Sequence, residues 1–438
     1  MKPLLSTKVL LSLAASLVLT AARGQEMPAP PVPSAAPCTQ IVYLDKNHVA
    51  SEVSASVKEA LLIASRETKN ALQLVKAGQA LEFLHNLEQP NVVIVSNPEV
   101  EQPQPNAYDF TKSKKFSKTF KVSSADKLNV ENQFGKVEVQ TWNRNEIAVE
   151  VNIITRASTD AKAQEILDKI NIQASQGSNL VSVVTVREPM HIQTASGKSF
   201  EVNYLVKMPK ANPVAIYNKF GDVVLPDLDG PSEVSVKYGS INAGRLNNKH
   251  NRVTLEYGKD LSTVDYMRGG NLNVKYSAFK LNSAETLMTT TAYSSIAIDN
   301  IDALAVESRY DRAFKVGNVN QLSGRGSYTT FTVTNLKESA GMEMKYCSKF
   351  EIANIASGFK KIDVNGGYTT INLNFADKTA FNFDVNTSYG NLKVDQDLVD
   401  YSFKEVRNTS ATYKGKFGKA ASKGLVNVTS KYGSVQFN

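Results

Sequence analysis

The chain has 438 residues and a formal net charge of +8, with 42% apolar and 21% charged residues, and this balance excludes a globally disordered protein. Its two cysteines exclude both a disulfide-dense scaffold and a cysteine-based metal site. The basic residues are scattered, apart from a lysine group between Lys112 and Lys121 that is typical of a solvated face.

Residues 1–24 have the layout of a secretory signal peptide. Lys2 and Lys8 precede an apolar run from Val9 to Ala22 that is too short to span a bilayer, and small residues at Ala22 and Gly24 suit a cleavage site. Cleavage would remove three of the 50 bases and no acid, and leave 47 bases, 42 acids and a net charge of +5. We therefore expect export to the periplasm, the cell surface or the medium, no membrane-spanning segment after cleavage, and no nucleic-acid partner.

Three short segments follow the predicted signal. Residues 25–47 are rich in Pro and Ala and predict a flexible leader. Residues 48–98 carry apolar side chains at helical spacing and predict a small helical region. Residues 99–115 have the composition of a linker.

Residues 116–212 change to strand character. The run from Ile147 to Ile153 alternates apolar and polar residues over seven positions, which predicts a half-buried strand. One helix is expected at 158–168, with Ser158 or Thr159 as its N-cap. Strands are expected again around 170–172, 180–186 and 201–208.

Residues 213–438 form an array of short alternating strands in which an aromatic residue recurs every 17 to 24 positions. The aromatic positions are Phe220, Tyr238, Tyr257, Tyr276, Tyr293, Tyr310, Tyr328, Tyr346, Tyr368, Tyr389, Tyr413 and Tyr432. Internal repetition at a short fixed period is typical of a solenoid, because strands this short must bury their apolar face on their neighbours. The sequence therefore predicts a mainly β protein: a parallel β-solenoid of about 12 coils with a tyrosine ladder.

Two further expectations follow from a stacked arrangement. A glycine that follows the aromatic, as in Tyr238-Gly239, would supply the positive φ of a turn. Replacement of a packed ladder residue, Tyr310→Ala, would cost about 3–5 kcal/mol. The competing interpretation is an antiparallel array of hairpins, as in a membrane β-barrel, but the short runs and polar outward positions favour the solenoid.

The segment from Val130 to Ile147 (VENQFGKVEVQTWNRNEI), with Lys237-Tyr-Gly-Ser-Ile241 and Lys431-Tyr-Gly-Ser-Val435, resembles the bacterial "putative adhesin" domains, formerly domains of unknown function. Such domains are common in exported proteins of Bacteroidetes-type bacteria. The resemblance covers about residues 116–438. It implies a β-solenoid and a cell-envelope or surface location, and it carries no catalytic residues to transfer.

No catalytic, cofactor-binding or metal-binding residues are predicted. The four histidines, His48, His85, His191 and His250, have no spacing suited to zinc. Two groups of acids are typical of loop turns: Asp222, Asp227 and Asp229, and Asp395, Asp397 and Asp400. Whether Cys38 and Cys347 form a disulfide is left open.

Three functions remain compatible with the sequence. The first is a non-enzymatic, adhesin-like envelope or surface protein that presents its solenoid to a protein or glycan ligand. The second is a periplasmic sensory or signalling partner that docks through residues 48–88. The third is a carbohydrate-active β-helix enzyme, which would need acids from different coils to converge on one groove. The sequence does not determine the oligomeric state.

Overall fold

The computed structural model describes residues 110–189 and 200–438, and the structural statements below concern these two stretches. The predicted signal peptide (1–24), leader (25–47) and helical region (48–98) lie outside the described residues. So do Cys38 and three of the four histidines, His48, His85 and His191.

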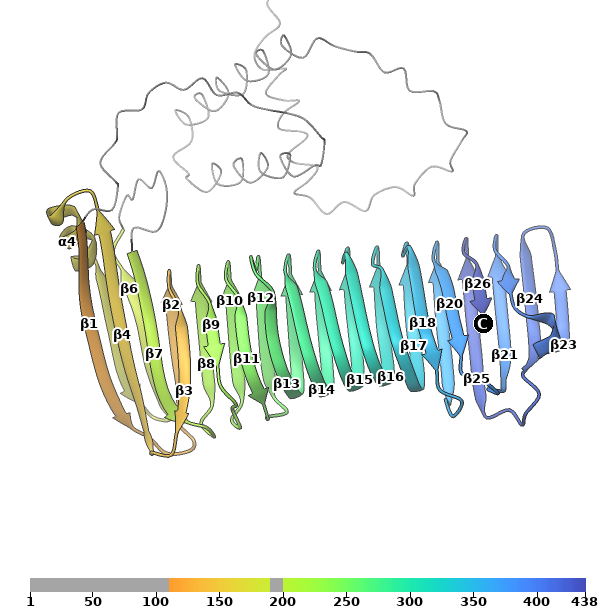
Figure 1. Ribbon diagram of the computed structural model, residues 1–438, viewed down its shortest axis with the longest axis horizontal. Coiled ribbons are helices and arrows are strands. Elements are labelled where there is room, and N and C mark those ends of the chain that lie inside the picture. The colour runs from red at the N-terminus through yellow and green to blue at the C-terminus, as the bar shows by residue number, and fades with distance from the viewer. Residues whose placement is uncertain (1–109, 190–199) are drawn as a thin grey trace, which may run out of the picture. The chain divides into compact units, whose positions relative to one another are not determined.

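The described chain folds as a two-layered parallel β-solenoid (Figure 1). Each turn contributes one strand to a first layer, bends sharply at an aromatic residue, and contributes the next strand to a second layer. Equivalent strands of successive turns pair in parallel and in register, so that Val234 lies between Ile216 and Val253. The parallel pairing excludes an antiparallel array of hairpins for these turns and confirms the predicted solenoid.

Nine turns follow one another in chain order. Their first-layer strands are β8 (Val214–Lys219), β10 (Ser232–Lys237), β12 (Asn251–Glu256), the second halves of β13 (Ser262–Lys275), β14 (Ala278–Ala292), β15 (Ser295–Arg309), β16 (Ala313–Ser327) and β17 (Phe331–Lys345), and β19 (Lys361–Gly367). Their second-layer strands are β9 (Val223–Leu225), β11 (Ile241–Leu246), the first halves of β13 to β17, β18 (Lys349–Ile355) and β20 (Thr370–Phe375).

The core lies between the two layers and is filled by one side of every strand. In β10, Val234 and Val236 are buried, whereas Glu233, Ser235 and Lys237 point outward, as the two-residue period of a strand requires. Large aromatic side chains stack inside as well: the Phe314 and Phe331 rings are 4.8 Å apart and nearly parallel. The alternation that predicted strands from the sequence is therefore the alternation between core and surface.

The N-terminal end is closed by a cap of mixed pairing. Its elements are β1 (Phe110–Lys121), β2 (Lys127–Gln133), β3 (Val137–Trp142), β4 (Glu146–Ala157), α4 (Asp160–Asp168), β5 (Ile170–Gly177), β6 (Leu180–Arg187) and β7 (Phe200–Pro209). β2 and β3 form a further turn beside β8 and β9, β6 and β5 extend the first layer, and β7, β4 and β1 extend the second. The Thr159 side chain caps α4 at Lys162 N, as predicted, and α4 is too short to cross a membrane.

The C-terminal end contains β21 (Phe381–Ser388), β22 (Leu392–Lys393), the 3-10 turn η1 (Gln396–Leu398), β23 (Val399–Val406), β24 (Ser410–Phe417), β25 (Gly424–Lys431) and β26 (Val435–Phe437). The last segment of the chain does not stack at the end. Instead, β25 inserts between β19 and β21, and β26 inserts between β20 and β22. The antiparallel pair β24 and β23 then forms the outer edge of the first layer (Figure 1).

Two details of the predicted repeat are wrong. Tyr413 is not a turn marker: it lies within β24 and is buried in the C-terminal cap. Nine turns in chain order also replace the predicted unbroken run of about 12, because three further turns, at Phe134, Tyr432 and Tyr389, lie towards the ends of the solenoid and do not follow in chain order. The first strand, β1, begins at Phe110, inside the segment whose composition suggests a linker.

Candidate functional site

The most regular surface feature is a column of stacked rings that we call the aromatic ladder. Its neighbouring rings have centroids 4.6–5.1 Å apart and planes within 16° of parallel. In stacking order its members are Phe134, Phe220, Tyr238, Tyr257, Tyr276, Tyr293, Tyr310, Tyr328, Tyr346, Tyr368, Tyr432 and Tyr389. The tyrosine ladder is thus confirmed. Phe134 is a member that the sequence pattern missed, although Phe134-Gly-Lys-Val137 has the same form as Tyr238-Gly-Ser-Ile241.

Each ladder residue occupies the left-handed region of backbone space, with φ between 50° and 62°. The prediction assigned positive φ to the following glycine, and this is wrong: the aromatic residue itself makes the turn. Its amide then donates to the next turn, as Tyr238 N does to the Glu256 carbonyl at 3.0 Å and Tyr310 N to the Ser327 carbonyl at 2.9 Å. The left-handed conformation costs a non-glycine residue about 1–2 kcal/mol. Ring stacking and an inter-turn hydrogen bond therefore stabilise it at the ladder positions.

Glycine after the aromatic is explained by close approach of neighbouring turns. A Cβ on Gly239 would lie 2.1 Å from the Gly221 carbonyl oxygen, and one on Gly221 would lie 2.0 Å from that of Gly135. Backbone atoms cannot move apart by that much without breaking the ladder of strand hydrogen bonds. Glycine at these turns therefore permits tight stacking.

The central turns use small polar side chains at the same position instead. The amide of each donates to the side chain of the next: Gly258 N to Ser277 Oγ at 2.8 Å, Ser277 N to Ser294 Oγ at 3.3 Å, and Ser294 N to Asp311 Oδ1 at 2.7 Å. The series goes on to Thr329 and resumes from Cys347 to Thr369. A buried row of side-chain acceptors thus replaces glycine.

Asp311 is the most unusual member of this buried row, because it is only 2% exposed. Its carboxylate accepts hydrogen bonds from the hydroxyls of Thr291 and Ser308 as well as from Ser294 N. Burial raises the pKa of Asp311 above its usual range, although these hydrogen bonds oppose the shift. Since the carboxylate faces the interior, it has no access to a substrate.

Nine of the twelve ladder residues are 40–58% exposed, for example 48% for Tyr310 and 45% for Tyr276, and the other three are partly buried. Stacking covers the ring faces within the ladder, so the outer surface presents ring edges and phenol hydroxyls. Partial burial is the main cause that raises the pKa of Tyr276, Tyr328 and Tyr368, and the neighbouring phenols raise it further. These hydroxyls therefore remain protonated at neutral pH and can donate hydrogen bonds to a ligand.

A second regular row lies on the outside of the second layer, where each turn bends. Asn318 donates to Asn300 at 2.7 Å, Asn335 to Asn318 at 2.7 Å, and Asn354 to Asn335 at 2.9 Å. Amide side chains that bond to their counterparts in successive turns stabilise stacked parallel strands. We assign this asparagine row a structural role, and the sequence repeat had not revealed it.

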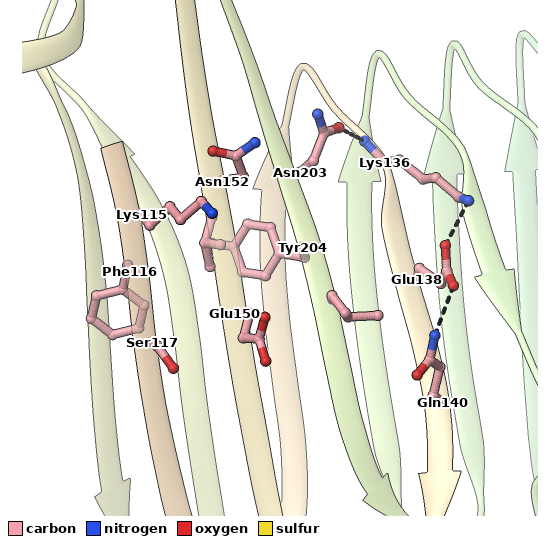
Figure 2. Close-up of a pocket in the computed structure, with 12 residues that line it drawn as sticks. Lys115, Phe116, Ser117, Lys136, Glu138, Gln140, Glu150, Asn152, Asn203 and Tyr204 are labelled. Carbon is pink, nitrogen blue, oxygen red and sulfur yellow. Dashed lines mark hydrogen bonds and ion pairs between the residues drawn. The ribbon is translucent and has the colours of Figure 1, made fainter. Parts of the chain in front are cut away.

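A shallow hollow of about 600 Å³ lies on the N-terminal cap between β1, β4, β7 and β3 (Figure 2). Its acids are Glu138 and Glu150. Hydrogen bonds from Lys136 and Gln140 hold the pKa of Glu138 below its usual range, which is the opposite of what a general acid needs. Burial raises the pKa of Tyr204, at the back of the hollow, to about 12, so its phenol is not a base at neutral pH.

Five of the six acids that the sequence singled out lie in loops or turns. Oδ1 of Asp222 accepts from Ser240, Oδ1 of Asp227 from Arg245 N, and Oδ1 of Asp229 from Asn247, each 18 residues further on. Asp395 caps η1, Asp397 lies in its first turn, and Asp400 lies on β23. The interpretation as loop-turn acids therefore agrees with the structure for all of them except Asp400, and the structure brings neither triad together as a site.

Metal-binding and redox chemistry have little support in residues 110–189 and 200–438. No group of three or more His, Cys, Asp or Glu side chains in these stretches is placed to hold a metal ion. His250 is an exposed loop residue. Cys347 is a free, buried thiol in the row behind the ladder, and burial raises its pKa, which lowers its reactivity.

Comparison with known proteins yields solved structures alone. No family model and no curated protein matches the chain. A "putative adhesin" from Parabacteroides distasonis is 12% identical, over 74% of this chain and 97% of its own, with a TM-score of 0.27. A "putative cell adhesion protein" from Clostridium sporogenes is 9% identical, over 74% and 99%, with a TM-score of 0.19.

A third match is a "putative lipid binding protein" from Parabacteroides distasonis, 11% identical, over 74% of this chain and 96% of its own, with a TM-score of 0.18. The adhesin names agree with the class that residues 116–438 resemble. Identities and TM-scores this low carry no weight for function.

Proposed function

We propose that the protein is an exported, adhesin-like component of the cell envelope or cell surface that binds its ligand without chemical conversion. The observation that carries this proposal is the aromatic ladder. It offers nearly the same group at every turn over twelve positions. A repetitive surface of this kind suits an extended or repetitive target better than it suits a small substrate.

The enzyme alternative has weaker support. A glycosidase needs two carboxyl groups across a groove, one of them with a raised pKa. In the hollow of Figure 2 the pKa of Glu138 is lowered, and the acid with a raised pKa, Asp311, is buried behind the ladder. The third candidate, a sensory partner, would retain the protein in the periplasm, and protease treatment of intact cells distinguishes it.

Cell adhesion with matched ladder variants tests the proposal. The test variant is Tyr293→Asn with Tyr310→Asn, because asparagine tolerates the left-handed conformation and removes only the ring. The control is Met288→Asn with Val406→Asn, which removes two exposed apolar side chains that lie off the ladder. Cells that express the full chain should bind a target surface, the ladder variant should lose most of this binding, and the control should keep it.

Two outcomes of this experiment would contradict the proposal. If expression of the full chain gives no binding above empty cells, or if the ladder variant binds as well as the unaltered chain, the ladder is not an adhesive surface. Thermal melts of both variants establish that each remains folded before the comparison is made.

A further inference from the structure

Cations gather along the aromatic ladder. Strand register places one residue of each turn directly before its ladder residue, and these twelve residues form a single row. Six of them are basic and one, Glu256, is acidic. The basic members are Lys219, Lys237, Lys275, Arg309, Lys345 and Lys431.

The other flank of the ladder adds three more cations and one acid, Asp222. Lys136, Lys259 and Arg312 each lie two residues after a ladder aromatic, where the chain enters the second layer. We call the ladder with these nine cations the basic ridge. Because strand pairing fixes the register, the cations lie on both sides of one line of ladder rings, ten of which carry a phenol hydroxyl.

Several of these cations have no acidic partner. Lys136, Lys237, Arg309 and Lys345 each form an ion pair with a glutamate, at 2.6–2.7 Å. By contrast, five exposed cations take part in none of the ion pairs within 4.0 Å among the described residues. These five are Lys219, Lys259, Lys275, Arg312 and Lys431.

The shape of the ridge limits what can bind it. It is a single line with a group every ~4.8 Å, the spacing of paired strands. Stacking covers the ring faces, so a neutral sugar cannot stack on a ring as sugars do on isolated aromatic residues. Binding must therefore come from charge along the line and from hydrogen bonds donated by the hydroxyls.

We propose that the basic ridge binds an extended acidic polysaccharide, one that carries carboxylate or sulfate groups along its length. The inference rests on the proposed function and names its ligand class. The unpaired cations contact the anionic groups, and the tyrosine hydroxyls donate to carboxylate and hydroxyl oxygens. An anionic membrane is the less favoured target, because the cations follow a single line of rings and do not form a broad patch.

The test measures binding of the full chain to immobilised polygalacturonate, with dextran and phosphatidylglycerol vesicles as the other two probes. The ridge variant is Lys219→Gln with Lys275→Gln and Lys431→Gln. The control is Lys249→Gln with Lys315→Gln and Lys337→Gln, which removes the same charge from exposed positions off the ridge. Each variant is first checked for an unchanged thermal midpoint.

We expect polygalacturonate to bind and dextran not to bind. The ridge variant should bind at least tenfold more weakly, with a shallower dependence on salt because fewer counterions are displaced. The control should bind as the unaltered chain does.

Three results would overturn the inference: equal loss in the control, equal binding of dextran, or binding of vesicles in place of polygalacturonate. A chain that binds none of the probes but still supports ladder-dependent adhesion refutes the ligand class and leaves the proposed function intact. A chain that neither binds any of the probes nor supports ladder-dependent adhesion refutes both the ligand class and the proposed function.

Discussion

At the scale of the residue, the ladder positions combine an unfavourable backbone conformation with a favourable ring. Tyr310 has φ of 54° and a side chain that is 48% exposed, with rings stacked at 4.8 and 5.1 Å on its two faces. The cost expected from the sequence, which assumed a fully packed ring, is therefore too large. Half-burial of the ring reduces the expected cost of Tyr310→Ala to about 2 kcal/mol.

Comparison of Tyr310→Ala with Tyr310→Gly separates the two effects. Both variants lose the ring, but glycine also relieves the left-handed conformation, so the glycine variant should be more stable by about 0.5–1 kcal/mol. The free energy of unfolding is measured for both in urea. An alanine variant that equals or exceeds the glycine variant in stability would mean that the left-handed turn is not what the residue adopts in solution.

Substitution of the glycine that follows a ladder residue should destabilise the protein, because a side chain would clash with the neighbouring turn. Gly239→Ala places a methyl group 2.1 Å from a carbonyl of the neighbouring turn and should cost about 2–4 kcal/mol. The matched control is Gly341→Ala on β17, where a Cβ meets nothing within 4 Å and which should be neutral or slightly stabilising. Equal urea midpoints for the two variants would argue against close stacking at this corner.

Asp311 should make stability depend on pH. Its pKa is raised in the folded state, so the folded protein binds the proton more tightly than the unfolded chain does. The penalty for burying the carboxylate is therefore absent below the unfolded pKa and grows as pH rises through the folded pKa. Asp311→Asn cannot titrate, so the unfolding free energy of the unaltered protein relative to this variant should increase as pH falls from 7 toward 4.

Urea unfolding at several pH values checks this expectation. A difference between the two proteins that does not change with pH, or that favours the variant at low pH, would contradict the buried position of the carboxylate. The variant retains an oxygen acceptor for the Ser294 amide, so it should remain folded throughout the range.

At the scale of the element, the inserted C-terminal turn is the most consequential feature. β25 and β26 lie between turns that are formed earlier in the chain, and the ring of Tyr432 lies between those of Tyr368 and Tyr389. The turn therefore fastens the C-terminal cap to the rest of the solenoid. Phe381 and Phe437 lie in a cluster of phenylalanine rings beside it.

A buried charge in this turn should release the cap and leave the remaining turns intact. Val428 is 1% exposed, so Val428→Asp should open β19 to β26 to amide hydrogen exchange while β8 to β16 stay protected, because solenoid turns depend mainly on their neighbours. The control Val406→Asp lies on the exposed edge strand β23 and should change little. Uniform loss of protection along the chain would contradict such modular stability.

Much of the fold could be predicted at this scale. The period of the aromatic residues indicated the turns, the alternation indicated the strands, and Thr159 marked the start of α4. The C-terminal insertion could not be predicted, because adjacency along the chain favours stacking in chain order and only packing at the ends decides otherwise. Tyr413 has the spacing of a marker, but β21 and β23 pair with its strand in antiparallel fashion, so it points into the cap.

The site was harder to predict than the fold. The ladder was visible as a repeat, yet its exposure, its covered ring faces and the positive φ of the aromatic residues depend on three-dimensional stacking. The basic ridge could not be recognised in the sequence, because its cations are far apart along the chain and become neighbours only through strand register. Lys219 and Lys431 look like scattered surface charges until that register is known.

At the scale of the whole molecule, the central claim is that each repeat adds one strand spacing to each layer. Tyr217 and Arg325 lie in one row of outward-facing residues, in which each residue is paired in register with its counterpart in the next turn, and six strand pairings separate the two. Six spacings of ~4.8 Å separate these two residues by about 29 Å. An array of antiparallel hairpins would use two strands per repeat and separate them by about 58 Å.

The most direct test is a pulsed electron-spin distance measurement between nitroxide labels on Tyr217→Cys and Arg325→Cys. Cys38 and Cys347 are first replaced by serine, which already occupies the position equivalent to Cys347 at Ser277 and Ser294. The predicted result is a single narrow distribution centred at about 29 Å, six strand spacings. A distribution centred at about 58 Å, twelve strand spacings, or a broad one without a maximum would contradict the stacked solenoid.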